Sequence, residues 1–213
     1  MLNTLIANPP KFHGDPAWGV GEMDWGTGTE VLRYLSEVLV PGMKTAETGA
    51  GKSTVLFAAK GCDHVTVTPS HDEPDRIRAY CEKLGISLDR VVFVNAPSEQ
   101  ALPTLVLSEI DLALIDGSHA FPWPILDFFY LSRVLRKDGL LIVDDIGIWT
   151  CGLLAEFLTR SKEWEVVRRF RDANAVVARK AVERFTDEWM RQPFPTAVAW
   201  TRRVRRLIRK VVR

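Results

Sequence analysis

The stretch Glu47-Thr48-Gly49-Ala50-Gly51-Lys52-Ser53-Thr54 lies between a short predicted strand and a predicted helix. Glycine has no side chain, so Gly49 and Gly51 let the backbone turn sharply and approach a ligand closely. Ser53 and Thr54 can cap the helix that follows. A glycine turn at a helix N-terminus presents free N–H groups and the positive end of the helix dipole. We therefore expect this loop to lie against a ligand.

Two kinds of ligand-binding loop fit these residues. Gly51-Lys52-Ser53 ends the GxxxxGK[ST] pattern of a P-loop, but the first glycine of that pattern falls on Ala46. Glu47 would also place a carboxylate beside the phosphates, which would repel it. The stretch resembles more closely the E-x-G-x-G loop of class I S-adenosylmethionine-dependent methyltransferases, where the acid lies near the cationic methionine end of the cofactor. We favour the methyltransferase and keep two alternatives, a P-loop NTPase and a cofactor-binding module without catalysis.

Size and composition indicate one globular domain with additions. The chain has 213 residues, of which 46% are apolar. No apolar run is long enough to span a bilayer, and the N-terminus lacks the basic and apolar regions of a signal peptide. The three cysteines have no CxxC spacing, so we expect neither a zinc site nor a disulfide framework. These features predict a cytoplasmic protein.

Strands alternate with helices five times along the chain, and a hairpin then closes the series. The predicted strands are residues 43–47, 64–68, 91–94, 111–115 and 140–143, with the hairpin at 164–170 and 175–178. Alternation implies a parallel sheet covered by helices on both faces, and the continuous apolar run at 91–94 suits a strand buried on both faces. Together with the resemblance, this predicts an α/β, Rossmann-like class I methyltransferase fold, with a mostly parallel seven-stranded sheet and a C-terminal antiparallel hairpin.

We divide the chain into three parts. Residues 1–26, rich in Pro, Gly and Trp, predict an irregular arm that either packs as a strap or folds over a pocket as a lid. Residues 27–180 form the methyltransferase domain that the resemblance covers. Residues 181–213 form a helical extension with a basic tail. We assign no chemical role to His13, a lone histidine in the arm.

The resemblance implies a cofactor site at the carboxyl ends of the strands, where ligands of open α/β sheets bind. An acid normally grips the ribose about 20 residues after the glycine loop, but here that strand ends at Thr68. Asp72 or Glu73 could substitute, or the Thr68 hydroxyl could make a weaker contact; for Asp72 we favour a helix cap before Pro74. Ser98 or Glu99 would contact adenine, and Ser98 equally suits a cap. The expected cofactor-binding residues are Glu47, Gly49, Gly51, Ser53, Thr68, Ser98, Glu99 and Asp116.

Three acids follow two neighbouring strands: Asp116, Asp144 and Asp145. Carboxylates brought together repel one another unless a cation lies between them, and oxygen ligands favour Mg²⁺. The positions resemble those that hold Mg²⁺ in metal-dependent O-methyltransferases of the catechol and macrolide-sugar type. The resemblance implies that Mg²⁺ on these acids, Asp116 among them, activates a substrate hydroxyl. His119, on the same loop as Asp116, suits removal of the hydroxyl proton; the alternative is a hydrogen bond within the loop.

Charge is unevenly distributed along the chain. The net charge is +1, and residues 201–213 carry seven Arg or Lys and no acid, which leaves −6 for residues 1–200. Apolar residues at helical spacing in this tail predict a basic amphipathic helix. It could keep the protein peripheral on an anionic membrane surface or dock on its own body, whereas the lack of interleaved aromatics argues against nucleic acid. We expect a small-molecule substrate, such as a sugar or polyketide-like hydroxyl, and leave a homo-oligomer open.

Overall fold

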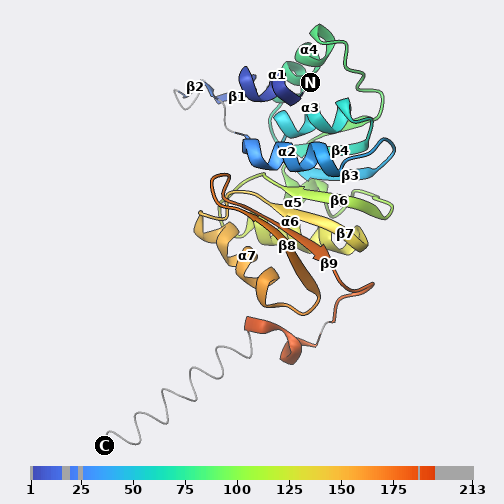
Figure 1. The fold of residues 1–213 in the computed structure, drawn as a ribbon, viewed down its shortest axis with the longest axis vertical. Helices are drawn as coiled ribbons and strands as arrows, with labels where there is room; N and C mark the ends of the chain where they lie inside the picture. The colour runs from blue at the N-terminus through green and yellow to red at the C-terminus, as the bar shows by residue number, and fades with distance from the viewer. Residues whose placement is uncertain (1, 16–19, 24–25, 187, 195–213) are drawn as a thin grey trace, which may run out of the picture.

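The computed structural model describes residues 2–15, 20–23, 26–186 and 188–194 (Figure 1), so the predicted tail helix at 201–213 lies outside the described residues. Seven strands form one sheet in the order β5-β4-β3-β6-β7-β9-β8. They are β3 (Lys44–Thr48), β4 (Asp63–Thr68), β5 (Val91–Asn95), β6 (Ile110–Ile115), β7 (Leu135–Val143), β8 (Trp164–Phe170) and β9 (Ala175–Lys180). Strands β3 to β7 pair in parallel, and β9 runs antiparallel to both β7 and β8. The predicted sheet with its C-terminal antiparallel hairpin is confirmed.

Helices cover both faces of this sheet because successive side chains of a strand point to opposite faces. One face carries α1 (Leu2–Ala7), α2 (Thr29–Val38), α3 (Lys52–Ala59) and α4 (Asp72–Lys83), and the other carries α5 (Ser98–Ala101), α6 (Trp123–Val134) and α7 (Trp149–Arg160). On β6, Leu112 and Leu114 pack into the first layer, while Ala113 and Ile115 pack into the second. A short 3₁₀ helix, Trp189–Arg191, follows β9. In the described part of the chain, no helix combines the length and apolarity needed to cross a bilayer.

The predicted helix caps at Ser53 and Asp72 are wrong, whereas Thr54 does take part in the cap of α3. α3 begins at Lys52, so Ser53 and Thr54 lie inside its first turn, where Thr54 Oγ1 accepts a hydrogen bond from the Gly51 N–H (2.9 Å). α4 begins at Asp72 itself. Pro74, two residues later, fits there because proline is tolerated within the first turn of a helix. The Asp72 carboxylate therefore makes no cap and instead forms an exposed ion pair with Arg76 (3.6 Å).

The expectation that residues 91–94 are buried on both faces is also wrong. They belong to β5, the edge strand, whose partner in the sheet is β4. Val92 on this strand is 55% exposed. A continuous apolar run is typical of central parallel strands, but an edge strand lies beyond the reach of the helices that cover the centre.

The N-terminal arm contains regular structure where an irregular backbone was predicted. After α1 come β1 (His13–Asp15) and β2 (Val20–Met23), which pair antiparallel. Leu5 of α1 is fully buried in the first helical layer. Phe12 is 3% exposed and meets the Tyr80 ring edge-on at 5.5 Å. These contacts fix the arm beside α4, as Figure 1 shows at the top of the molecule.

The chain changes direction between β3 and β6, which are neighbours in the sheet although two strands separate them in sequence. Gly49, just after β3, has φ +88°, and a Cβ there would lie only 2.2 Å from the backbone oxygen of Asp116. The Gly49 N–H donates to the Val67 carbonyl (2.9 Å), and the Asp116 N–H donates to the Thr48 carbonyl (3.1 Å). Three strand ends are therefore tied together at the point where open α/β sheets bind ligands.

Replacing Gly49 tests how much the fold depends on this close approach. Gly49→Ala should lower the free energy of unfolding by about 3 kcal/mol or more, because the new Cβ meets backbone that cannot swing away. Gly85→Ala is the matched control: Gly85 has φ +66° and nothing within 4 Å of its added Cβ, so only the backbone strain of about 1 kcal/mol applies. Urea denaturation of both variants measures the difference. Equal losses would show that the approach at Gly49 is not a constraint.

Candidate functional site

Two cavities open at the carboxyl ends of the strands and share one wall. We call the cavity of about 460 Å³ beside Gly49 the glycine-loop cavity, and the cavity of about 620 Å³ beside Asp144 and Asp145 the acidic cavity. The residues that line both are His13, Ala50, Asp116, Gly117 and Ser118. The loop that follows β6 therefore forms much of the wall that the two cavities share.

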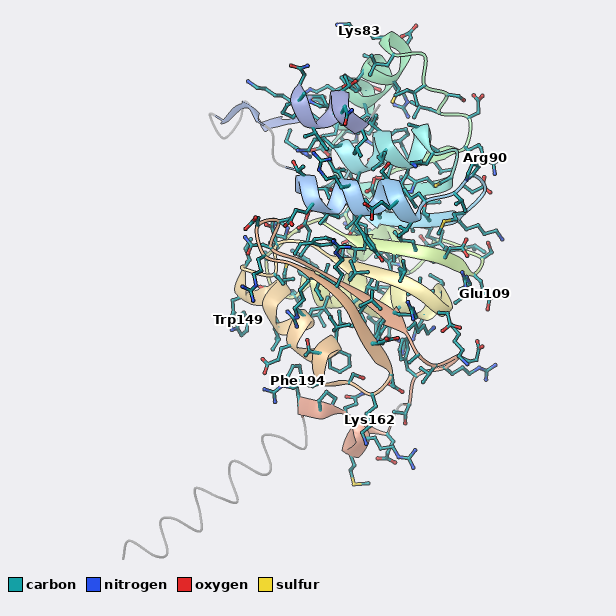
Figure 2. All side chains as sticks on the ribbon, viewed as in Figure 1. Lys83, Arg90, Glu109, Trp149, Lys162 and Phe194 are labelled. Carbon is teal, nitrogen blue, oxygen red and sulfur yellow. The ribbon has the colours of Figure 1, made fainter. Side chains whose placement is uncertain are left out.

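The orientation of the sheet can be followed in Figure 2. Arg90 and Glu109, which precede β5 and β6, lie at the right of the molecule, and Trp149, which follows β7, lies at the left. Both cavities therefore lie at the left edge, where the arm also lies.

Most of the predicted cofactor-binding residues line these cavities. The glycine-loop cavity is lined by Gly49, Thr68, Ser98, Glu99 and Asp116, and the acidic cavity by Gly51, Ser53 and, again, Asp116. Residues from the ends of β3, β4, β5 and β6 thus converge on one elongated space.

Glu47 is the exception, because it lies behind the glycine loop. It is 1% exposed and lines neither cavity. Its Oε1 accepts a hydrogen bond from Thr54 Oγ1 and lies 3.0 Å from His64 Nε2. Thr54 Oγ1 in turn accepts from the Gly51 N–H. Glu47 Oε2 is buried and has no hydrogen-bond partner among the described residues, and the expected contact of Glu47 with the cofactor stays a prediction.

Glu73 supplies the acid that β4 lacks at its end. Thr68 Oγ1 donates to Glu73 Oε2 (2.8 Å), and the Glu73 N–H donates to Ser70 Oγ (3.2 Å). His13 Nδ1 lies 2.9 Å from Glu73 Oε1. The side chain of Asp72, by contrast, is 73% exposed. Of the two acids considered from the sequence, Glu73 is the one at the cavity wall.

The acids after β6 and β7 converge, but not as the set expected from the sequence. Asp116, His119 and Asp145 each offer one ligand atom, and these atoms lie within 4.8 Å of one another. Asp144 is outside this group: it is 4% exposed, and its Oδ1 accepts a hydrogen bond from the Asp145 N–H (2.9 Å). His119 Nε2 lies 3.3 Å from Asp145 Oδ2. The structure thus places a histidine where the sequence predicted a third carboxylate.

Negative charge is crowded in the acidic cavity. Burial, followed by the charge of Asp144, raises the pKa of Asp116 well above its ordinary value, against a hydrogen bond from Thr27 Oγ1 (2.9 Å). Burial also raises the pKa of Asp144 to about 6, although the Asp145 backbone N–H stabilises the ionised form. Desolvation and like charges both disfavour the ionised state, so a positively charged ligand would relieve this strain.

The sequence analysis missed three residues at the site. His13 lines both cavities, Thr27 holds the Asp116 carboxylate, and Trp123 lines the glycine-loop cavity. No local pattern distinguished them, because each reaches the site through the path of the backbone.

Residues 46–146 match a family model described as a methyltransferase domain. No curated protein matches the chain in sequence.

Solved structures share the fold at low sequence identity. The cofactor-bound protein Rv0187 from MTB has a TM-score of 0.62 at 17% identity, over 74% of this chain and 83% of that chain. The O-methyltransferase TomG from Streptomyces achromogenes, involved in tomaymycin synthesis and solved in complex with SAM, has a TM-score of 0.61 at 14% identity, over 78% and 86%. An rRNA methylase from Streptococcus thermophilus has a TM-score of 0.57 at 15% identity, over 75% and 99%. At these identities the likeness shows the fold alone.

Neutralising one of the crowded acids tests the electrostatic account. Because the pKa of Asp116 is raised in the folded state, the folded protein binds more protons than the unfolded chain above pH about 4, so stability falls as pH rises through the raised pKa. Asp116→Asn removes this titration. In EDTA, the variant should gain stability relative to the wild type between pH 5 and pH 8, and the gain should grow as pH rises.

Urea denaturation at several pH values measures the gain, and Asp89→Asn, at an exposed position, is the control that should show no such trend. A difference between Asp116→Asn and the wild type that stays constant with pH would contradict the account.

Proposed function

We propose that this chain, whose residues 46–146 match a family model described as a methyltransferase domain, acts as a class I S-adenosylmethionine-dependent methyltransferase. It transfers the methyl group of S-adenosylmethionine (SAM) to a hydroxyl oxygen of a small molecule. One observation carries the proposal: a cavity suited to a nucleoside and a cavity lined by acids meet at the Asp116 loop. A methyl donor in the first and an acceptor in the second would face each other across that loop.

The glycine-loop cavity offers a place for each part of the donor. Ser98, Glu99 and Trp123 lie at the end where adenine would bind. Thr68 and Glu73, joined by a hydrogen bond, lie where the ribose hydroxyls would bind. The sulfonium would then reach Asp116, which lines both cavities. In a weakly polar site, nearby carboxylates attract a sulfonium and repel the phosphates of ATP, which supports a methyl donor over an NTP.

The reaction breaks the S–CH₃ bond and forms an O–CH₃ bond, while the sulfonium takes the bonding electron pair and becomes a neutral thioether. The acceptor hydroxyl must also lose a proton. His119 is suited to accept it, because an unprotonated imidazole nitrogen takes up a proton; its Nε2 lies 3.3 Å from Asp145 Oδ2 and makes no hydrogen bond to the described residues. Most of the rate acceleration would come from holding the two reactants in line.

A divalent cation is the second candidate, supported by the convergence of Asp116, His119 and Asp145. Two carboxylates and one imidazole fit Mn²⁺ or Zn²⁺ as well as Mg²⁺. A cation bound there would supply Lewis-acid stabilisation of the acceptor oxygen. His119 would then be a metal ligand and could not accept the proton, so it can have only one of these two roles.

An exposed aromatic pair offers a surface for the part of an acceptor that extends beyond the acidic cavity. The pair consists of Phe121 and Trp149, whose ring centroids are 6.4 Å apart and which follow the two acid-bearing loops. They are 66% and 71% exposed, and Figure 2 shows Trp149 at the outer edge of the molecule. Aromatic surface of this kind favours an organic acceptor with an apolar part.

Isothermal titration calorimetry with SAM, S-adenosylhomocysteine and ATP tests the donor. We expect one site for SAM and S-adenosylhomocysteine and none for ATP, because the cavity is lined by acids. Ser98→Trp, which fills the adenine end, should abolish binding, whereas Ser87→Trp, on a loop at the opposite end of the strands, should leave it intact. Binding of ATP alone would overturn the proposal.

Titration of the S-adenosylhomocysteine complex with Mn²⁺ and Mg²⁺ separates the two roles of His119. If the cation is held as proposed, the wild type binds one ion, and both Asp145→Ala and His119→Ala weaken it at least tenfold, since each loses a ligand. If the wild type binds no ion, the metal-assisted candidate fails and His119 remains the proposed base.

A further inference from the structure

We propose that His13, carried over the glycine loop by the N-terminal arm, binds the amino-acid end of the methyl donor as an imidazolium, donating from Nδ1 to Glu73 and from Nε2 to the carboxylate of the donor. This inference rests on the proposed function and adds a residue to the same site from outside the methyltransferase-like core.

The arm holds His13 in place through its neighbour. Phe12 is buried against Tyr80, and Arg76 Nη1 donates to the Phe12 carbonyl (2.8 Å). Both partners belong to α4, which also carries Glu73. With the backbone of Phe12 fixed, the next side chain projects into the space between α4 and the glycine loop. The position of the ring therefore follows from core packing of the arm.

The two ring nitrogens of His13 face different parts of the site. Nδ1 lies 2.9 Å from Glu73 Oε1, and a carboxylate only accepts, so Nδ1 carries a proton. Nε2 faces the glycine loop: it lies 3.2 Å from the position of a Cβ on Gly51 and 3.7 Å from one on Gly26. A side chain at either glycine would fill the space in front of Nε2. The ring thus extends from Glu73, the acid expected beside the ribose, to the wall that the two cavities share.

The surroundings of Nε2 favour an anionic group. Gly51 is the N-cap of α3, so the first N–H groups of that helix lie beside the same space. The Lys52 side chain passes Gly26, with its Cε 3.2 Å from a Cβ placed there. The sulfonium donor carries one anionic group, the carboxylate at the end opposite adenine. With adenosine along Thr68 and Ser98, that carboxylate falls on the side of Gly51, within reach of His13.

A matched pair of ligands isolates this contact. S-adenosylhomocysteine and 5′-methylthioadenosine share adenosine and a neutral thioether, but only the first has the amino-acid end. By calorimetry, His13→Ala should weaken S-adenosylhomocysteine by about 10- to 100-fold, as expected for loss of a charge-assisted hydrogen bond. Binding of 5′-methylthioadenosine should change less than threefold.

Two further variants separate the ends of the ring. His13→Asn keeps a donor near Nδ1 for Glu73 and should weaken S-adenosylhomocysteine as His13→Ala does. His13→Gln places its amide near Nε2 and should recover part of the affinity. Lys11→Ala, at an exposed position on the same arm, is the control and should bind like the wild type. Thermal melts followed by circular dichroism establish that each variant is folded.

Equal weakening of both ligands by His13→Ala would overturn the inference, since the ring would then act only by bracing Glu73. Unchanged binding of both would overturn it as well. Failure of the wild type to bind either ligand would instead refute the proposed function and this inference with it, so the two failures are distinguishable.

Discussion

The close approach of the Gly49 and Asp116 backbones is the constraint on which the site depends. It is possible only without a Cβ at position 49, and it brings the ends of β3 and β6 together where the chain reverses its direction of winding. The glycine loop and the acid-bearing loop are consequently neighbours. Sheets of this kind bind ligands at such a point because the loops on either side diverge and leave a crevice. Both cavities are parts of that crevice.

Charge gives the crevice its preference. Asp116 and Asp144 are held in a site that disfavours their ionised forms, and Glu47 adds a buried carboxylate behind the loop. In this structure Glu47 Oε1 contacts Thr54 and His64 behind the glycine loop, while Oε2 has no hydrogen-bond partner among the described residues. A cationic sulfur centre, or a divalent cation, lowers the energy of such a site, whereas a polyphosphate raises it.

Much of the fold could be predicted because periodicity and alternation are local properties of the sequence. The strands around Glu47 and Asp116 and the hairpin at the C-terminal end of the sheet follow from such patterns. The edge position of β5 does not follow from such patterns, because an apolar run does not indicate which helices will cover the strand. The candidate site was predictable where a residue follows a strand, as for Asp116, and not where partners come from afar, as for His13 and Glu73, 60 residues apart.

A crystal structure of the protein with S-adenosylhomocysteine tests the central claim, that one crevice holds donor and acceptor on either side of the Asp116 loop. We predict adenine beside Ser98, ribose hydroxyls at Thr68 and Glu73, and the thioether sulfur facing the acidic cavity. Density for the adenosine part of the ligand outside the glycine-loop cavity, or with its sulfur directed away from Asp116, would contradict the account.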